Sequence, residues 1–119
     1  MNYEGDCMKK LTIFIVSDSI GETAELVAKA AASQFGRGLN SVTLKRFSHI
    51  EDETQLEESA LLAKEQNAVI VYTLVKSCMR KRIKVECQKQ DVKCIDLLGP
   101  VVEQISQQLD EKPMEEPGL

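Results

Sequence analysis

The stretch Leu11-Thr-Ile-Phe-Ile-Val16, followed directly by Ser17-Asp-Ser-Ile-Gly-Glu-Thr23, decides the fold. Its first half is a run of β-branched and aromatic residues, which is typical of a strand buried on both faces. Its second half is polar, and from Glu22 onward the apolar residues recur at helical spacing. The stretch therefore predicts a buried strand, a polar loop and the start of a helix.

The same alternation of strand and helix patterns continues along the chain. Strands are predicted at 11–16, 41–47, 68–73 and 92–97, and helices from Glu22, at 52–66, at 77–90 and from Pro100. Single helices between strands imply right-handed crossovers and a parallel sheet. The sequence thus predicts an α/β fold: a three-layer, doubly wound sandwich with a parallel sheet of four strands, (βα)4, in the order 2-1-3-4. Such a domain, spanning 10–110, is Rossmann-like or flavodoxin-like.

Two helices carry apolar stripes that we expect to face the sheet. In the first helix the stripe consists of Ala24, Val27, Ala30, Ala31 and Phe35, and in the last helix of Val101, Val102, Ile105 and Leu109.

Length and composition exclude several classes of protein. The chain has 119 residues, enough for one domain, with 43% hydrophobic, 29% charged and only 4% aromatic residues. Its net charge of -4 argues against a duplex-binding module, so no nucleic-acid partner is expected. The longest apolar run is too short to span a membrane and no secretory signal precedes it, which predicts a cytoplasmic protein without membrane contact.

The cysteines do not form a recognisable metal or disulfide pattern. Cys7, Cys78, Cys87 and Cys94 include no C-x-x-C pair, and the single histidine, His49, is distant from all four in sequence. We expect no metal site and no structural disulfide, with Cys87 and Cys94 serving as small core residues.

Charge is unevenly distributed between two predicted helices. Residues 76–93 hold seven basic and two acidic residues, whereas 51–66 hold six acidic and one basic. These faces could meet in an oligomer, attract an acidic partner or simply be solvated.

The loop after the first strand is the strongest candidate for a binding site. Ligands of doubly wound sheets bind outside the carboxyl ends of the strands, where the winding reverses. Hydroxyls, a glycine and a helix N-terminus in this loop are suited to an anion, most naturally a phosphate. The alternative is that Ser19 or Thr23 only caps the helix. The candidate residues are Ser17, Asp18, Ser19, Gly21, Glu22 and Thr23.

Two further candidates follow other strands at the same edge. Lys76 could supply positive charge to the first loop, and Asp96 could hold a ribose hydroxyl or a metal ion. A solvated helix-start lysine and a turn aspartate are the alternatives, and His49 reads as incidental. The chain contains no G-x-x-x-x-G-K-[ST], G-x-G-x-x-G or G-x-S-x-G segment. We therefore assign no catalytic residue to it.

Four segments together resemble a known family. Ile15-Val-Ser-Asp-Ser-Ile-Gly-Glu-Thr-Ala-Glu25, Tyr72-Thr-Leu-Val75, Asp96-Leu-Leu-Gly-Pro100 and Glu116-Pro-Gly-Leu119 resemble the amino-terminal half of the bacterial pyruvate, phosphate dikinase regulatory proteins. The related phosphoenolpyruvate synthase regulatory proteins belong to the same family.

The resemblance implies a bifunctional regulator of one of these two enzymes. Such proteins use ADP to phosphorylate a threonine of the dikinase and use inorganic phosphate to remove that phosphate, releasing pyrophosphate. Their nucleotide loop, G-x-S-R-x-x-K-T-P, lies in the carboxy-terminal half and has no counterpart here. We therefore expect residues 1–9 to be a flexible extension and 111–119 to begin a linker to an absent catalytic domain. By itself the chain would be inactive and hold no tightly bound cofactor.

The alternative is a non-catalytic module of similar fold. It would be a flavodoxin-like domain that binds phosphate or a nucleotide, or a domain that forms a homodimer.

Overall fold

The computed structural model describes residues 9–118, and its centre is a parallel sheet of four strands. The strands are β1 (Leu11–Ser17), β2 (Val42–Phe47), β3 (Ala68–Thr73) and β4 (Cys94–Asp96), in the order β2-β1-β3-β4. β1 pairs with β2 on one side and with β3 on the other, so that Ile13 lies opposite Leu44 of β2 and Val69 of β3. The predicted order 2-1-3-4 is confirmed, as are the parallel sheet and the edge position of β2.

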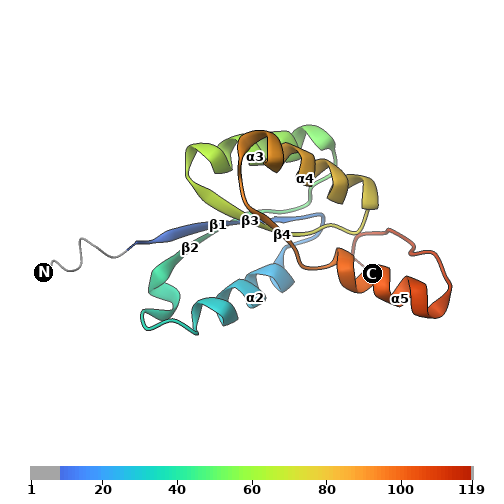
Figure 1. The fold of residues 1–119 in the computed structure, drawn as a ribbon, viewed down its shortest axis with the longest axis horizontal. Coiled ribbons are helices and arrows are strands. Elements are labelled where there is room, and N and C mark those ends of the chain that lie inside the picture. The colour runs from blue at the N-terminus through green and yellow to red at the C-terminus, as the bar shows by residue number, and fades with distance from the viewer. Residues whose placement is uncertain (1–8, 119) are drawn as a thin grey trace, which may run out of the picture.

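Helices lie on both faces of this sheet (Figure 1). α2 (Glu22–Ala32) packs on one face, while α3 (Glu53–Glu65) and α4 (Ser77–Gln90) lie side by side on the other. A short 3-10 turn, η1 (Gly38–Ser41), precedes β2, and α5 (Gly99–Leu109) follows β4. The predicted three-layer α/β sandwich is therefore correct.

The larger part of the core lies between the sheet and the pair α3 and α4. Phe14 of β1 is fully buried there, and its ring centroid lies 4.8 Å from that of Phe47. The other large members are Leu56, Ile70, Leu74 and Ile83. Cys87 belongs to this cluster and Cys94 packs against it, as predicted, whereas Cys7 lies outside the described residues.

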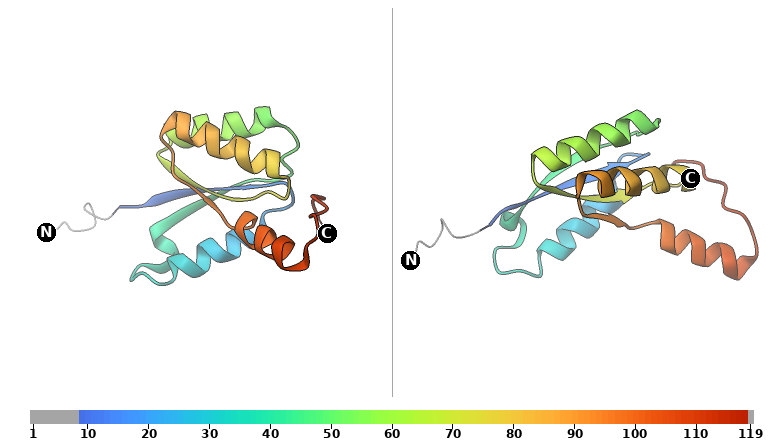
Figure 2. Two further views of the ribbon diagram at one scale, coloured as in Figure 1. Left: turned by 45° about the vertical axis from the view of Figure 1, so that its right-hand side comes forward. Right: turned by 45° about the horizontal axis from the view of Figure 1, so that its top comes forward.

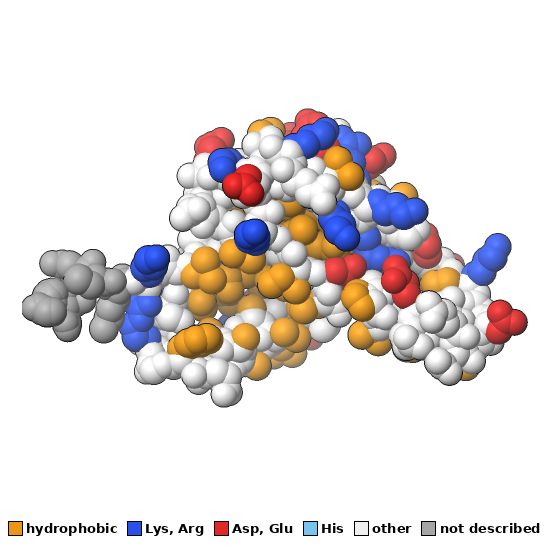
Figure 3. Space-filling model, in the orientation of Figure 1, with side chains coloured by type: hydrophobic (Ala, Val, Ile, Leu, Met, Phe, Trp, Pro, Cys, Tyr) orange, Lys and Arg blue, Asp and Glu red, His pale blue; other side chains and the backbone are white. Residues whose placement is uncertain are grey.

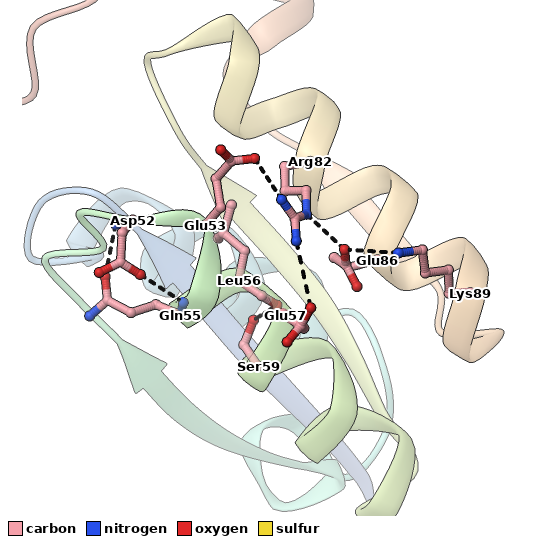
Figure 4. A network of polar contacts seen from close by, with 9 residues as sticks. All are labelled: Asp52, Glu53, Gln55, Leu56, Glu57, Ser59, Arg82, Glu86 and Lys89. Atoms are coloured by element: carbon pink, nitrogen blue, oxygen red, sulfur yellow. Dashed lines mark hydrogen bonds and ion pairs between the residues drawn. The ribbon is translucent and has the colours of Figure 1, made fainter.

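The acidic and basic helices meet within the chain (Figure 4). Asp52 caps α3 through the backbone N–H of Gln55, whose side chain returns a bond to the Asp52 N–H. From α4, Arg82 reaches Glu53 at 2.7 Å and Glu57 at 3.6 Å on α3. The predicted charge asymmetry is thus used, at least in part, to join α3 to α4.

The last helix departs from the prediction. α5 projects beyond the carboxyl end of the sheet instead of turning back to cover it (Figure 2). The expected inward residues Val101, Ile105 and Leu109 are therefore 57%, 52% and 60% exposed. The expected stripe of α2 is also largely uncovered, because only its Ala24 is buried; α2 ends at Ala32, and Phe35 beyond it is 68% exposed.

The segment after α5 extends the domain at its carboxyl end. The predicted extension, 1–9, lies outside the described residues apart from Lys9. After α5 the chain turns and returns toward the carboxyl edge of the sheet (Figure 2), so that residues of 113–118 lie against the loops described next. No helix within residues 9–118 is long and apolar enough to cross a membrane.

Candidate functional site at the carboxyl edge of the sheet

A cavity of about 360 Å³ lies at the carboxyl ends of β1 and β3. One wall comes from the loop after β1, a second from the end of β3, and a third from the start of α5. The returning tail forms the fourth wall. The lining residues are Asp18, Ser19, Gly21, Thr23, Thr73, Val75, Leu98, Val102, Pro113, Met114, Glu115, Glu116 and Gly118.

Three hydroxyl groups, two of which line this cavity, form a hydrogen-bonded chain. The fully buried Ser17 Oγ accepts hydrogen bonds from Thr73 Oγ1 at 3.0 Å and from the Ser19 N–H at 3.1 Å. Both lone pairs of Ser17 Oγ then accept hydrogen bonds. The Ser17 hydroxyl proton can therefore be donated to Ser19 Oγ, 3.2 Å away. The Ser19 O–H in turn is left to donate toward the cavity that Ser19 lines.

The loop itself is held from the side of β2. The backbone N–H groups of His49 and Ile50 donate to the carbonyl oxygens of Ser19 and Ser17 at 2.9 and 3.0 Å. The Ser48 hydroxyl donates to the Ile20 carbonyl at 2.9 Å. These hydrogen bonds restrain the loop, which reduces the conformational entropy that ligand binding would cost.

The N-terminus of α2 opens beside this loop without a side-chain cap. Its N-cap residue is Gly21, with φ of 85°, and no side chain within residues 9–118 caps the first amides of the helix. The alternative that Ser19 or Thr23 caps the helix is therefore wrong. A Cβ at Gly21 would lie 3.1 Å from Ile15 Cγ2, so both φ and space favour glycine here.

Asp18 joins the two central loops of the site. Its Oδ2 accepts a hydrogen bond of 2.8 Å from the Val75 N–H, at the end of the segment that follows β3. Lys76, the next residue, is exposed and lines a second cavity of about 470 Å³ together with Asp18, His49 and Glu51. The structure thus places Lys76 on a different cavity from Ser19 and Thr23, with Asp18 lining both.

Asp96 is occupied in the turn that begins α5. Its Oδ1 accepts hydrogen bonds from the N–H groups of Leu98 at 3.0 Å and Gly99 at 2.7 Å. Its Oδ2 lies 3.8 Å from Nε of Arg80, which is 7% exposed. These hydrogen bonds agree with the alternative in which Asp96 stabilises a turn. Asp96 is not among the residues that line the 360 Å³ cavity.

Comparison with known proteins identifies the family. The sequence profile of a kinase/pyrophosphorylase family matches residues 13–119. The chain belongs to the kinase/pyrophosphorylase family. A protein of Lysinibacillus sphaericus named as a pyruvate, phosphate dikinase regulatory protein is 42% identical over 112 residues, covering 94% of this chain and 42% of the relative. A protein of the same name from Staphylococcus aureus is 41% identical over the same shares. The chain thus spans less than half the length of these relatives.

Half of the predicted site residues of this kinase/pyrophosphorylase chain line one cavity. Asp18, Ser19, Gly21 and Thr23 do so directly, while Ser17 lies buried beneath them. The other three do not line this cavity: Glu22 is exposed, and Lys76 and Asp96 lie elsewhere. Within residues 9–118, no group of three or more His, Cys, Asp or Glu side chains is arranged to hold a metal ion.

Two parts of this candidate site were not predicted from the sequence. Arg80 donates through Nη1 to the carbonyl oxygens of Leu74 and Val75, at 3.0 and 2.9 Å, and so holds the loop after β3. Arg80 lies between the buried residues Met79 and Ile83 of α4, and this position could have predicted that its side chain is buried. The tail residues Met114 and Glu116 gave no such signal, because a polar, proline-containing segment has no periodicity.

Proposed function

We propose that this chain is the amino-terminal part of a regulator of pyruvate, phosphate dikinase or of phosphoenolpyruvate synthase. The regulator would be an ADP-dependent protein-threonine kinase that inactivates its target, and a phosphate-dependent pyrophosphorylase that reactivates it. The observation that carries this proposal is the family match over residues 13–119, with relatives of that name at 41–42% identity. We assign phosphoryl transfer to the region that these relatives possess beyond the matched part, since the expected nucleotide loop has no counterpart here.

Within that protein, we propose that the 360 Å³ cavity binds a phosphate group of ADP or inorganic phosphate. Support comes from the donors that converge on it: the free proton of Ser19, the Thr23 hydroxyl and the uncapped amides of α2. Amides at a helix N-terminus attract anions both by hydrogen bonding and through the helix dipole.

Carboxylates on the same cavity set a condition on this binding. Asp18, Glu115 and Glu116 line its walls, and they would repel a multiply charged phosphate. We therefore expect the ligand to enter with Mg²⁺, whose preferred ligands are carboxylate and phosphate oxygens.

Calorimetric titration of the chain with ADP, and separately with inorganic phosphate, tests the cavity. We expect binding of at least one of them, stronger with MgCl₂, and about 5- to 10-fold weaker in Ser19→Ala because one hydrogen bond is lost. Ser33→Ala is the matched control, since the Ser33 hydroxyl bonds the Lys29 carbonyl at the far end of α2. Absence of binding by both ligands would refute the proposed role of the cavity.

A phosphorylation assay tests the division of labour. Incubated with the dikinase and ADP, the 119-residue chain should yield no phosphothreonine, whereas a full-length relative should. Phosphothreonine formed by this chain alone would show that the assignment of transfer to the missing region is wrong.

A further inference from the structure

A third cavity, of about 280 Å³, lies between the amino-terminal half of α4 and the start of α5. Three cationic residues of α4 line it, namely Arg80, Lys81 and Lys84. Figure 3 shows basic and acidic side chains meeting in the hollow between these two helices. No residue that lines this cavity also lines the 360 Å³ cavity. It is therefore a separate candidate site, and the function proposed above makes no use of it.

Consecutive residues of β3 contribute to these two cavities. Thr73 lines the 360 Å³ cavity, and Tyr72 lines the 280 Å³ cavity. Successive side chains of a strand point to opposite faces of the sheet. One strand end thus supplies polar groups to two different cavities.

Arg80 is buried, but only one of its nitrogen atoms is hydrogen-bonded within residues 9–118. Its side chain is 8% exposed, and Nη1 donates to the carbonyl oxygens of Leu74 and Val75. Nε lies 3.8 Å from Asp96 Oδ2 and Nη2 lies 3.8 Å from Glu103 Oε2, beyond the range of about 2.7–3.2 Å for a hydrogen bond. Buried charged donors without an acceptor are costly. Nε and Nη2 form one edge of the guanidinium group, which can bind two oxygen atoms of one anion.

Two hydroxyl groups add to these donors. Tyr72 is 3% exposed, and neither its hydroxyl nor that of Ser77 is hydrogen-bonded to another residue in the range 9–118. Burial raises the pKa of Tyr72, so its hydroxyl stays protonated at neutral pH and can donate. Buried polar groups normally have a hydrogen-bond partner. A ligand oxygen in the cavity would supply the acceptor that the described residues do not.

The charges around the cavity favour an anion. Lys81 and Lys84 are exposed, and neither forms a salt bridge within residues 9–118. Of the two carboxylates, Asp96 is engaged by backbone amides of its turn, whereas the side chain of Glu103 is 67% exposed and can turn toward solvent. Together with Arg80, the lysines give three cations against two carboxylates. The surplus is positive, and it grows when Glu103 moves away.

The donors and the volume of the cavity define the kind of anion. The guanidinium edge, two hydroxyls and two ammonium groups exceed what the two oxygens of a carboxylate can accept, whereas a phosphate monoester has three terminal oxygens. A volume of about 280 Å³ is small for a ligand site. Among the lining residues the only aromatic one is Tyr72, whose ring belongs to the core and offers no face to a nucleobase. The site therefore suits a small, non-aromatic ligand.

We propose that this cavity binds the phosphate group of a small, non-aromatic phosphate monoester. The groups that would hold it are the Nε and Nη2 edge of Arg80, the hydroxyls of Tyr72 and Ser77, and the ammonium groups of Lys81 and Lys84. The proposal does not depend on the ligand proposed for the 360 Å³ cavity, because the two cavities share no residue.

Titration of the chain with glycerol phosphate, followed residue by residue through backbone amide NMR signals, tests this site. We expect saturable shifts at Ser77, Lys81 and Glu103, while Ser19 and Thr23 report separately on the other cavity. Acetate, which carries a carboxylate instead, should bind at least about fivefold more weakly because it accepts fewer hydrogen bonds. Absence of saturable shifts at these three amides, or equal binding of acetate, would overturn the proposal.

Surface variants of opposite charge test the electrostatic part. Arg80 also holds the loop after β3, so exposed residues are changed instead. Lys84→Gln should raise the dissociation constant about threefold, and Glu103→Gln should lower it by a similar factor, because it removes the carboxylate that faces Arg80. Lys93→Gln is the matched control: this exposed lysine does not line the cavity, and its substitution should change the constant less than about 1.5-fold. Weaker binding by Glu103→Gln, or equal effects of Lys84→Gln and Lys93→Gln, would contradict the assignment.

Tyr72→Phe separates binding from packing. The substitution keeps the ring in the core and removes only the hydroxyl, which has no partner within residues 9–118. Thermal denaturation should therefore show stability that is unchanged or raised. Glycerol phosphate should bind about fivefold more weakly, because one hydrogen bond to a charged acceptor is lost. Binding as tight as that of the wild type would show that this hydroxyl does not face the ligand, and would refute the proposed site.

Discussion

The carboxylate of Asp18 accepts a hydrogen bond of 2.8 Å from the backbone N–H of Val75, 57 positions away in the sequence. This single contact joins the loops that follow β1 and β3, the two central strands. Asp18 also lines both the cavity that includes Ser19 and the one that includes Lys76. Asp18 therefore contributes to both cavities while its carboxylate is held by the segment after β3.

Removing this acceptor should destabilise the fold. We expect Asp18→Ala to lower the free energy of unfolding by about 1–3 kcal/mol, because the Val75 N–H loses a charged partner at a partly buried position. Asp18→Asn keeps an oxygen in the same place and should lose less than half as much. Urea denaturation followed by circular dichroism measures both. Equal stability of Asp18→Ala and the wild type would contradict this role.

The ion pairs between α3 and α4 should make stability depend on pH. Arg82 bonds to Glu86, whose side chain is 3% exposed, and this bond lowers the pKa of Glu86. A carboxyl group with a lowered pKa stabilises the fold above its unfolded-state pKa, and this contribution is lost as the pH falls through the folded-state value.

Arg82→Met should therefore lower the urea midpoint at pH 7, and the difference from wild type should shrink on acidification toward pH 3. Lys81→Met is the control: this neighbouring residue of α4 is exposed, and no salt bridge to it is present among the described residues. A difference between Arg82→Met and wild type that stays constant from pH 7 to pH 3 would rule out the titration of Glu86 as its cause.

The turn before α5 should not tolerate a side chain at Gly99. Because an added Cβ would overlap Asp96 Oδ2, we expect Gly99→Ala to cost about 1–3 kcal/mol of stability. Gly36→Ala is the matched control, since nothing lies within 4 Å of a Cβ there and its effect should stay within about 0.5 kcal/mol. Thermal denaturation of the two variants side by side measures the contrast, and similar losses in both would disprove the predicted clash.

The Cys87 and Cys94 pair should react unequally with alkylating agents. The interaction with the Cys87 thiol lowers the pKa of Cys94, and the same interaction raises the pKa of Cys87. Since the thiolate is the nucleophile, iodoacetamide should reach half its maximal rate of Cys94 modification at a pH below the value of about 8.5 for a free cysteine.

Peptide mass spectrometry after timed alkylation assigns the modified residue. Cys87→Ala removes the neighbouring thiol, so the midpoint of Cys94 should move upward toward that of an ordinary thiol. A midpoint of Cys94 that is the same with and without Cys87 would exclude this cause.

The strands and their order could be predicted because both depend on local chemistry and on a general winding rule. The run 11–16 is β-branched and aromatic, a composition that suits a buried strand wherever it lies in the sheet. The carboxyl-edge rule directed attention to the loop of Ser19, Gly21 and Thr23, and these three residues line the 360 Å³ cavity.

The predictions that were wrong concern which surface covers a helix and which cavity a side chain lines. An apolar stripe such as that of Ile105 shows that a helix face is to be covered, but contains no information about which surface covers it. Likewise, the carboxyl-edge rule places Lys76 at the correct edge but does not determine on which side of Asp18 its side chain falls. Sheet topology was predictable, whereas side-chain direction required the structure.

The central position of β1 has a consequence for how the protein is made. β1 pairs with β2 on one side and β3 on the other, so the ribosome completes this strand before residues of either partner exist. The apolar segment has no partner until residues 42–47 emerge, and its second edge stays unpaired until residues 68–73 emerge. An exposed strand of this kind favours aggregation. Lys9 and Lys10 directly before it and Asp18 directly after it place charges at both ends of the segment, which opposes self-association during synthesis.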